Sequence, residues 1–381
     1  MIAPANSAER KFLTGGTRIL LGLSIAGGVA ILYRLTFGLG AATNLNDAHP
    51  WGLWIAADVM AGVALAAGGY TMSAAYYVFA MKKYKPIVRP AILTAFLGYF
   101  IAAIGITMDI GKPWAIWHPL AFGQAHSVMF EVALCVATYL TVLALEFGPV
   151  AAEGLRKEKI RKVLTAITYP LVIAGIVLSF LHQSSLGALF LLMKGRLSDL
   201  WYTPILPQLF FLSSIAVGLA TVSFESILSA RSLKRAPETD ILRGLARGAR
   251  ITLALYLIVK LGDLIVRGKL GLVFAGDLAS LMWLLEIGVG VVLPLVLYSS
   301  KAARESTSGL FWAAACVIAG VVLNRFDVNF FAQAGARTSY FPAFTEILVT
   351  VGLISFLVLA YRFLVFHLPV LAHEPEPVGR T

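Results

Sequence analysis

The sequence predicts an all-α polytopic membrane protein with about ten transmembrane helices. Of its 381 residues, 59% are hydrophobic and only 13% are charged, and the mean hydropathy is +0.83. Soluble domains carry about 25% charged residues. Long apolar stretches recur along the chain, and no polar stretch reaches the roughly 50 residues of a small soluble domain. The whole chain is therefore expected to be organised around the membrane.

Ten apolar stretches define the helices, and short loops rich in Gly and Pro separate them. A membrane-spanning helix needs about 20 largely apolar residues. The expected ranges are 17–40, 51–81, 88–109, 126–148, 163–192, 204–230, 248–267, 279–299, 309–330 and 342–366. The transmembrane domain, 17–366, divides into helices 1–5 (17–192) and helices 6–10 (204–366). Cytoplasmic tails, 1–16 and 367–381, flank it.

Lys and Arg residues set the expected orientation. Most of the 31 fall in the tails and in the loops on the same side of the membrane, and the loops on the other side hold few. By the positive-inside rule, both termini lie in the cytoplasm, here of a bacterial inner membrane. The periplasmic loops 41–51, 110–125 and 195–207 are rich in Trp and Pro and are the better docking surface. The net charge of +11 reflects the basic loops, so no nucleic-acid partner is expected.

Each of the first five helices carries an ionisable residue in its outer half. Arg34 on helix 1 lies about 9 Å below the outer end, Asp58 on helix 2 about 10 Å, and Glu131 on helix 4 about 8 Å. Asp109 ends helix 3 at the same face, and His182 lies near the outer end of helix 5. A charge inside the membrane costs about 2.5–3.5 kcal/mol. These side chains should therefore face the protein interior, with Arg34 as the charge partner of the acids.

Helix 5 interrupts its apolar run with four hydrogen-bonding side chains. Residues 178–192 read LSFLHQSSLGALFLL, which places His182, Gln183, Ser184 and Ser185 together. A quinone ring sits among apolar side chains, its two carbonyl oxygens need hydrogen-bond donors, and its reduction consumes two protons. The run therefore indicates a buried redox or proton site, with these four residues as quinone contacts.

Acidic residues near this run are expected to relay protons. Glu131, Cys135 and Thr138 are spaced i, i+4 and i+7, which places them on one face of helix 4. We therefore expect Glu131, Asp58, Asp109 and Thr138 to form the relay.

Helices 7–9 also carry buried charges. Lys260 and Asp263, spaced i and i+3 on helix 7, are expected to form a local structural pair. Glu286 on helix 8 and Arg325 on helix 9 must likewise face the interior and find partners.

Several stretches resemble the NrfD/polysulfide-reductase family of integral membrane subunits. They are HPWGLWIAADVMAGVALAAGGY, HSVMFEVALCVATYLTVLALEF, LSFLHQSSLGALFLL, LWYTPILPQLFFLSS and NRFDVNFF. The resemblance extends from about helix 1 to helix 10. Within the family, the chain resembles most the HybB branch, the membrane subunits of hydrogenase-2 type nickel–iron hydrogenases.

The resemblance implies a fold and a role. The fold would be two four-helix bundles with flanking helices. The subunit would exchange electrons between the menaquinone or ubiquinone pool and a periplasmic ferredoxin-like iron–sulfur subunit, which is linked to the small and large subunits of a nickel–iron hydrogenase. The matching motifs carry Asp58, Glu131 and the run from His182 to Ser185. Trp54, in the same motif as Asp58, joins the expected quinone contacts.

The sequence gives less support to other cofactors and functions. A six-coordinate haem needs two facing axial ligands, and only His126 and His182 share a depth on separate helices. Cys135 and Cys316 are too few for an iron–sulfur cluster, which needs about four thiolates. We therefore expect no haem, no cluster and no metal in this chain. A b-type cytochrome, a molybdenum-enzyme membrane subunit and a proton-coupled transporter are the alternatives. Membrane lipid is the remaining expected partner, and whether protons are translocated stays open.

Overall fold

The computed structural model describes residues 12–47, 49–232, 236–333 and 340–371. The tails expected at 1–16 and 367–381 lie largely outside these residues. Within them the chain is helical, and one isolated bridge joins Asn46 and His49. The helices are α1 (Gly15–Phe37), α2 (Leu39–Ala42), η2 (Trp54–Ala61), α3 (Gly62–Leu65), α4 (Gly68–Ser73), η3 (Ala74–Val78), η4 (Lys82–Tyr84), α5 (Lys85–Asp109), η5 (Pro113–Ala115), α6 (His118–Ala121), α7 (Val128–Gly154), α8 (Glu158–Ala166), α9 (Thr168–Leu191), α10 (Leu206–Ser232), α11 (Thr239–Val266), η6 (Leu270–Phe274), α12 (Leu278–Ile287), η7 (Gly288–Val292), α13 (Leu293–Ser299), α14 (Lys301–Glu305), α15 (Thr307–Asn329), η8 (Phe331–Gln333) and α16 (Phe344–His367).

The expected spans match these helices closely. Across the described ranges, nine helical segments are long and apolar enough to cross a membrane. The remaining expected span, 248–267, corresponds to α11, which is 28 residues long but carries Arg250, Lys260 and Asp263 in its apolar part. One boundary differs: the first residues of expected helix 5 form the separate helix α8, and α9 begins at Thr168.

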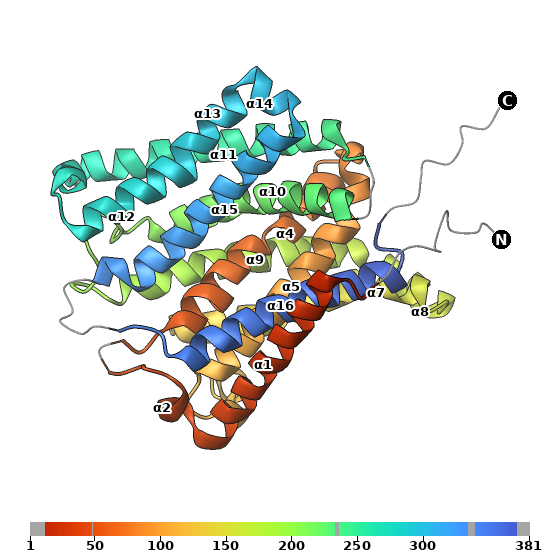
Figure 1. Ribbon diagram of the computed structural model, residues 1–381, viewed down its shortest axis with the longest axis horizontal. Coiled ribbons are helices and arrows are strands. Elements are labelled where there is room, and N and C mark those ends of the chain that lie inside the picture. The colour runs from red at the N-terminus through yellow and green to blue at the C-terminus, as the bar shows by residue number, and fades with distance from the viewer. Residues whose placement is uncertain (1–11, 48, 233–235, 334–339, 372–381) are drawn as a thin grey trace.

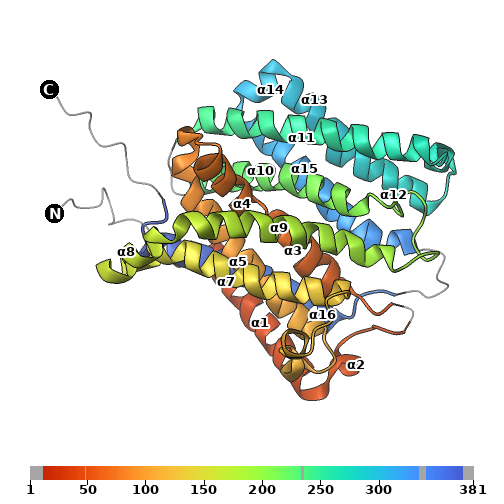
Figure 2. The ribbon, with the colours of Figure 1, turned by 180° about the vertical axis from the view of Figure 1, so that it is seen from behind.

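The long helices form two neighbouring bundles and a flanking pair (Figures 1 and 2). The first bundle contains the second span (54–78), α5, α7 and α9. The second contains α10, α11, the span α12–α13 and α15. Helices α1 and α16 pack against each other beside the first bundle. They run antiparallel: Phe12, just before α1, contacts Phe363 and Phe366 near the end of α16. This arrangement fits the fold that the family resemblance implied.

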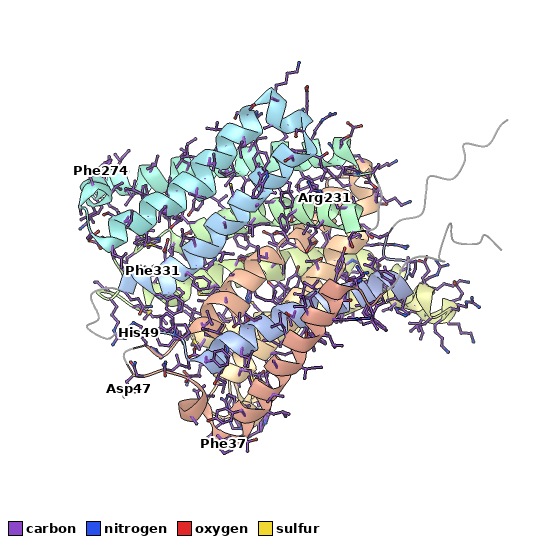
Figure 3. All side chains as sticks on the ribbon, in the orientation of Figure 1. Phe37, Asp47, His49, Arg231, Phe274 and Phe331 are labelled. Carbon is purple, nitrogen blue, oxygen red and sulfur yellow. The ribbon has the colours of Figure 1, made fainter. Side chains whose placement is uncertain are left out.

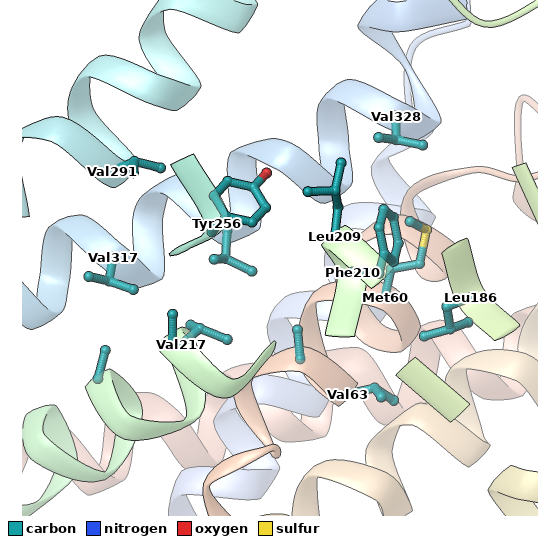
Figure 4. Packing of buried hydrophobic residues seen from close by; sticks show 14 of the residues in the cluster. Met60, Val63, Leu186, Leu209, Phe210, Val217, Tyr256, Val291, Val317 and Val328 are labelled. Carbon is teal, nitrogen blue, oxygen red and sulfur yellow. The ribbon is translucent and has the colours of Figure 1, made fainter. Parts of the chain in front are cut away.

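A continuous apolar core joins the two bundles (Figure 4). Met60, Val63 and Leu186 come from the first bundle, and Phe210 and Val217 come from α10 of the second. Burying side chains of this size removes apolar surface from lipid and water and gains close dispersion contacts. The bundles are therefore packed as one body.

The second span is not a regular α-helix. Its first part, η2, and its last part, η3, are wound as π-helix. A π-helical turn is rare and shifts the direction in which the following side chains point. The segment η2 carries both Trp54 and Asp58, and α5 leaves room for it at Gly105, where an added Cβ would lie 2.9 Å from the Cβ of Asp58.

The two ends of the molecule differ in character. Helices α7, α10 and α16 end where α5 and α11 begin, and we call this the basic end because Lys and Arg residues cluster there. In Figure 3, Arg231 lies toward this end, whereas Asp47, His49 and Phe331 lie at the opposite side of the molecule. We call that opposite side the aromatic end. Which end faces the cytoplasm stays a prediction.

Candidate functional site

Glu131 and Ser185 meet between α7 and α9. The Ser185 hydroxyl lies 2.6 Å from Glu131 Oε1 and donates to it, and it also lies 2.7 Å from the Leu181 carbonyl oxygen. Glu131 stands in the first turn of α7, where Ser127 caps the helix by accepting from the Phe130 amide. A carboxylate is favoured there because the free amide groups of a helix start carry partial positive charge. The structure thus brings together two of the residues expected at the site.

His182 and Gln183 are completely buried beside this pair. Gln183 Nε2 donates to the Val63 carbonyl oxygen at 3.0 Å, which ties α9 to α3. Neither ring nitrogen of His182, nor Oε1 of Gln183, has a hydrogen-bond partner among the residues that the structure describes. Burying such a group without a partner costs about 1–3 kcal/mol. These atoms therefore have the capacity to bind a polar group that enters the bundle.

Aromatic side chains connect His182 to α7, whose Glu146 lies nearer the basic end. The His182 ring packs edge-on against Tyr99 of α5 with 5.4 Å between centroids, and Tyr99 packs against Tyr139 of α7 at 4.5 Å. Two turns further along α7 lies buried Glu146. Gly175 of α9 leaves space for its carboxyl, since an added Cβ would lie 2.8 Å from Glu146 Oε1. Tyr99, Tyr139 and Glu146 were missed by sequence reasoning, although an acid inside an apolar helix was a usable signal.

Asp58 and Trp54 face α16 rather than the Glu131–Ser185 pair. Thr350 of α16 donates its hydroxyl to Asp58 Oδ2 at 2.8 Å, and Asp58 Oδ1 has no partner within the described part of the chain. Trp54 Nε1 donates to the Glu346 carbonyl oxygen at 3.2 Å. Both residues are buried. The expected quinone contact Trp54 is thus engaged with α16 and packs in an apolar cluster between α5 and the flanking pair.

The start of α16 holds the loop that precedes η2. The Glu346 carboxylate accepts from the Asn44 amide at 3.0 Å and from the Tyr340 hydroxyl. Tyr340 also accepts from the Leu53 amide at 3.0 Å. Burial and the bond to Glu346 raise the pKa of Tyr340, so its hydroxyl stays protonated and donates. This network fixes the loop that positions Trp54 and Asp58.

Arg34 does not pair with Asp58 or Glu131 as expected. Its Nε donates to the Met108 carbonyl oxygen at 2.7 Å, and Nη2 donates to the Ile110 carbonyl oxygen at 2.5 Å. The last carbonyl groups of a helix lack partners within the helix and carry partial negative charge, so they attract a cation. Asp109, also expected in the relay, lies close enough to interact electrostatically with Arg34.

Two further expected residues are less buried than their neighbours in the sequence. Thr138 is exposed on α7, whereas Cys135 on the same helix is buried. Ser184 is half-buried on α9, next to buried Gln183 and Ser185. The spacing argument placed Glu131, Cys135 and Thr138 on one face of helix 4. That face is buried at Cys135 but exposed on the outside of the molecule at Thr138.

The expected Lys260–Asp263 pair is wrong. Lys260 Nζ lies 2.5 Å from Glu286 Oε1 on α12, and both side chains are almost fully buried. Trp201 Nε1 donates to Glu286 Oε2 at 2.8 Å. Asp263 instead pairs with Arg267 at 2.6 Å. Helical spacing alone could not reveal that Lys260 points across the second bundle.

His126 and His182, the two histidines expected at a shared depth, lie in different surroundings. His182 is buried, whereas His126 lies exposed in the turn before α7. Axial ligation needs two imidazoles that face one haem from opposite sides, and these two lie in different surroundings. Cys135 and Cys316 are both free. We therefore derive no step through a haem or a cluster. That the chain carries neither stays a prediction.

In the part of the chain that the structure describes, nine long apolar segments and α11 form two bundles and a flanking pair, which indicates a multi-pass membrane protein. Residues 41–334 match the family model described as polysulphide reductase, NrfD. The chain belongs to this family.

Three relatives span nearly the whole chain. A protein of Nitratidesulfovibrio vulgaris is 40% identical and covers 97% of this chain and 98% of its own length. The probable Ni/Fe-hydrogenase 2 b-type cytochrome subunit of Escherichia coli is 34% identical, covering 90% and 88%. The integral membrane subunit of a menaquinone reductase of Nitratidesulfovibrio vulgaris is 26% identical, covering 92% and 90%. The chain is thus a multi-pass membrane protein related to the membrane subunits of redox enzymes.

Proposed function

We propose that the chain is the quinone-reactive membrane subunit of a respiratory nickel–iron hydrogenase complex. The observation that carries the proposal is the Glu131–Ser185 pair beside His182, whose buried ring nitrogens lack partners in the described chain. The relation to the hydrogenase 2 subunit supports the hydrogenase partner. The relation to the menaquinone reductase subunit supports quinone as the substrate.

The reaction defines what each residue would do. One quinone takes up two electrons and two protons to become a quinol, and hydrogen oxidation in the partner enzyme releases two electrons for it. A quinone ring that enters from the lipid beside α7 and α9 would find a donor in the His182 ring, because the single hydroxyl hydrogen of Ser185 is donated to Glu131. Glu131, hydrogen-bonded to Ser185, would pass protons to the quinone oxygen. The buried Tyr99, Tyr139 and Glu146 extend a polar path toward the basic end, which supports proton uptake from that side.

The aromatic end is the proposed docking surface for a periplasmic ferredoxin-like iron–sulfur subunit. Trp114, Trp117 and Phe122, all in the loop between α5 and α7, are strongly exposed. Large exposed apolar patches mark interaction surfaces. Trp201, in the expected docking loop 195–207, is buried against Glu286 and is not available for contact. The docking surface therefore centres on residues 110–125.

A second candidate differs only in the partner enzyme. The alternative partner is a molybdenum enzyme of the polysulfide-reductase type in place of a hydrogenase, and the match to the polysulphide reductase family model favours it. Co-purification of the native complex distinguishes the two, because a nickel–iron large subunit would be found only with the first.

Replacing Glu131 tests the proposed proton role. We expect Glu131→Gln to leave assembly and hydrogen oxidation with an artificial dye intact, because the glutamine keeps the hydrogen bond to Ser185. Quinone-linked turnover should fall by roughly 100-fold or more, the typical loss when a proton-transfer group is removed. Glu131→Asp should restore part of the rate. Both activities are measured on the purified complex.

The Glu131 experiment has two contrary outcomes. Normal abundance together with normal quinone reduction in Glu131→Gln would show that no proton passes through this carboxyl. An equal fall of the dye-linked and quinone-linked activities would show a role in folding or assembly. Thr141→Val, a change at an exposed residue of the same helix with no expected role in the relay, serves as the control and should leave quinone reduction unchanged.

Surface substitutions test the docking proposal. We expect Trp114→Ala with Trp117→Ala to weaken assembly with the iron–sulfur subunit, because these are the exposed aromatic anchors. Charge reversal of Arg156, Lys157 and Lys159 at the basic end should leave assembly intact. Co-purification of the partner from membranes measures both. Loss of the complex in the second variant, and not in the first, is the opposite of what we expect.

A further inference from the structure

The stretch NRFDVNFF, at the end of α15, carries a buried acid to which the proposed function gives no role. Asp327 is completely buried, and no donor in the described part of the chain reaches either of its carboxyl oxygens. Burying an ionised carboxylate without a donor is strongly unfavourable, because the group loses its hydration and gains no hydrogen bond. The charge state of Asp327 therefore depends on its neighbours.

The first neighbour is the buried ion pair of the second bundle. The carboxyl group of Asp327 lies close enough to Glu286 and Lys260 to interact with both. Glu286 Oε1 accepts from Lys260 at 2.5 Å and from Tyr256 at 3.2 Å. Two carboxylates that share a buried site do not both ionise, because their charges repel. A proton on Asp327 removes this repulsion and lets Asp327 donate to Glu286.

Arg325 has the opposite effect on Asp327. It is completely buried, and its guanidinium packs over Phe210 at 3.7 Å. Its hydrogen bonds in the described chain go to neutral oxygens. Arg325 and Lys260 together carry two positive charges, which Glu286 alone cannot balance. Ionised Asp327 would balance them. Repulsion from one acid and attraction from an excess cation therefore oppose each other, which brings the two states of Asp327 closer in free energy.

Two small cavities adjoin this group of side chains. Each has a volume of about 10 Å³, which is close to the space that one water molecule needs. Thr203, Lys260 and Asp263 are among the residues that line the first cavity. Glu286 lines the second, and Tyr256 lines both. Polar groups in both linings can bind a water molecule, so a proton can pass between these side chains through water.

Asp263 connects the first cavity to the aromatic end. Helix α11 begins at the basic end, and Asp263 lies three residues before its last residue, Val266. The Asp263 carboxylate accepts from the Thr203 hydroxyl at 2.7 Å and pairs with Arg267 at 2.6 Å. Its side chain is 10% exposed. Asp263 therefore contacts the surface of the aromatic end and the buried cavity at the same time.

We propose that Asp327 and Glu286 hold one exchangeable proton between them, and that this proton is exchanged with water at the aromatic end. On release, the O–H bond of Asp327 breaks, and the proton passes by way of Glu286 and the two cavities to water at Asp263. Asp327 is left as a carboxylate, and uptake reverses these steps. No electron is transferred. The first bundle is proposed to draw protons from the basic end, so the second bundle would provide a separate proton site at the other end. This proposal is independent of quinone chemistry.

Infrared spectroscopy of the purified full-length chain tests the proposal, because a protonated carboxylic acid has a carbonyl band distinct from that of a carboxylate. We expect Asp327→Asn to remove one component of this band. Glu286→Gln should remove the same component, since Asp327 would then be the remaining carboxylate beside Lys260 and would ionise. In the wild-type chain the component should shift when H₂O is replaced by D₂O. Thr203→Val should slow that shift, because it removes a hydroxyl between the cavity and Asp263.

Asp240→Asn is the matched control. Asp240 is an exposed acid at the other end of α11, paired with Arg243, and its loss should leave the band and its exchange unchanged. Thermal unfolding shows whether each variant is folded, and Glu286→Gln provides the measurement if Asp327→Asn is not. An unchanged band in the folded variants would mean that Asp327 is ionised. A component that does not shift in D₂O would mean a sealed proton, and an equal shift rate in Thr203→Val would exclude the route past Asp263. Each of these results would overturn the proposal.

Discussion

Lys260 and Glu286 form the most buried ion pair in the part of the chain that the structure describes. Tyr256 and Trp201 complete the hydrogen bonding of the carboxylate at 3.2 and 2.8 Å. Charges taken out of water are tolerated only when such partners satisfy them. The second bundle thus carries a fully bonded ion pair, although both carboxylate oxygens of Asp327 in the same bundle lack partners in the described chain. The first bundle is the better candidate for chemistry because its acid, Glu131, is hydrogen-bonded to Ser185 on the helix that carries His182.

Removing one member of the pair should destabilise the chain strongly. We expect Lys260→Met to lower the free energy of unfolding by about 3–5 kcal/mol, because Glu286 would remain as an uncompensated buried charge. The double variant Lys260→Met with Glu286→Leu should recover most of the loss. Thermal unfolding in detergent measures both. A double variant as unstable as the single one would show that packing around Lys260, and not its charge, is what matters.

Sequence reasoning found the residues of the site better than their partners. Estimated depth correctly grouped Glu131 with the polar run of helix 5, since rise per residue is fixed in any helix. The partner of Asp58 is Thr350, which is 292 positions away along the chain. No local pattern could predict that contact. Lys260 was assigned to the wrong acid for the same reason: spacing reveals neighbours on one helix and nothing about the facing helix.

The flanking helices α1 and α16 touch through glycine. A Cβ on Gly27 would lie 2.6 Å from the Cα of Gly352, so the two backbones meet with no side chain between them. Small residues at such crossings let membrane helices approach closely and gain dispersion contacts. Close packing therefore holds the two helices together. The hydrophobic effect does not drive their association, because the lipid around them is as apolar as their side chains.

Enlarging one glycine should separate the pair. We expect Gly27→Leu to cost about 1–3 kcal/mol of stability through overpacking. Gly28→Leu is the control, because nothing lies within 4 Å of a Cβ at that position. The unfolding temperature in detergent compares the two variants. Equal effects of both changes would mean that the close approach contributes nothing.

Element boundaries followed from the sequence to within a few residues for most spans. Apolar length is a local property, and it determines where a helix can cross the membrane. The π-helical winding of η2 and the separation of α8 from α9 were not predicted, because both depend on how neighbouring helices pack. The winding matters for the contact with α16, since η2 carries Trp54 and Asp58, which both bond to that helix.

At the scale of the whole molecule, basic residues gather at one end. We expect this end to face the cytoplasm, because positively charged loops are retained there during insertion. A reporter that is active only in the periplasm should give no signal when fused after Lys85 and a strong signal when fused after Arg196. Signals in the reverse order would show the opposite orientation and would place the proposed docking surface in the cytoplasm.

The contact between the two bundles has a kinetic consequence. A Cβ on Gly218 of α10 would lie 2.7 Å from the Ala67 carbonyl carbon, so α10 meets the second span backbone to backbone. A transporter that alternates its access rocks one bundle against the other in microseconds to milliseconds. Bundles that interlock in this way have little freedom to rock. Internal proton movement would then depend on side-chain rotation in picoseconds to nanoseconds. We therefore expect the turnover rate to be limited by diffusion of quinone through the bilayer, and so to fall as membrane viscosity rises.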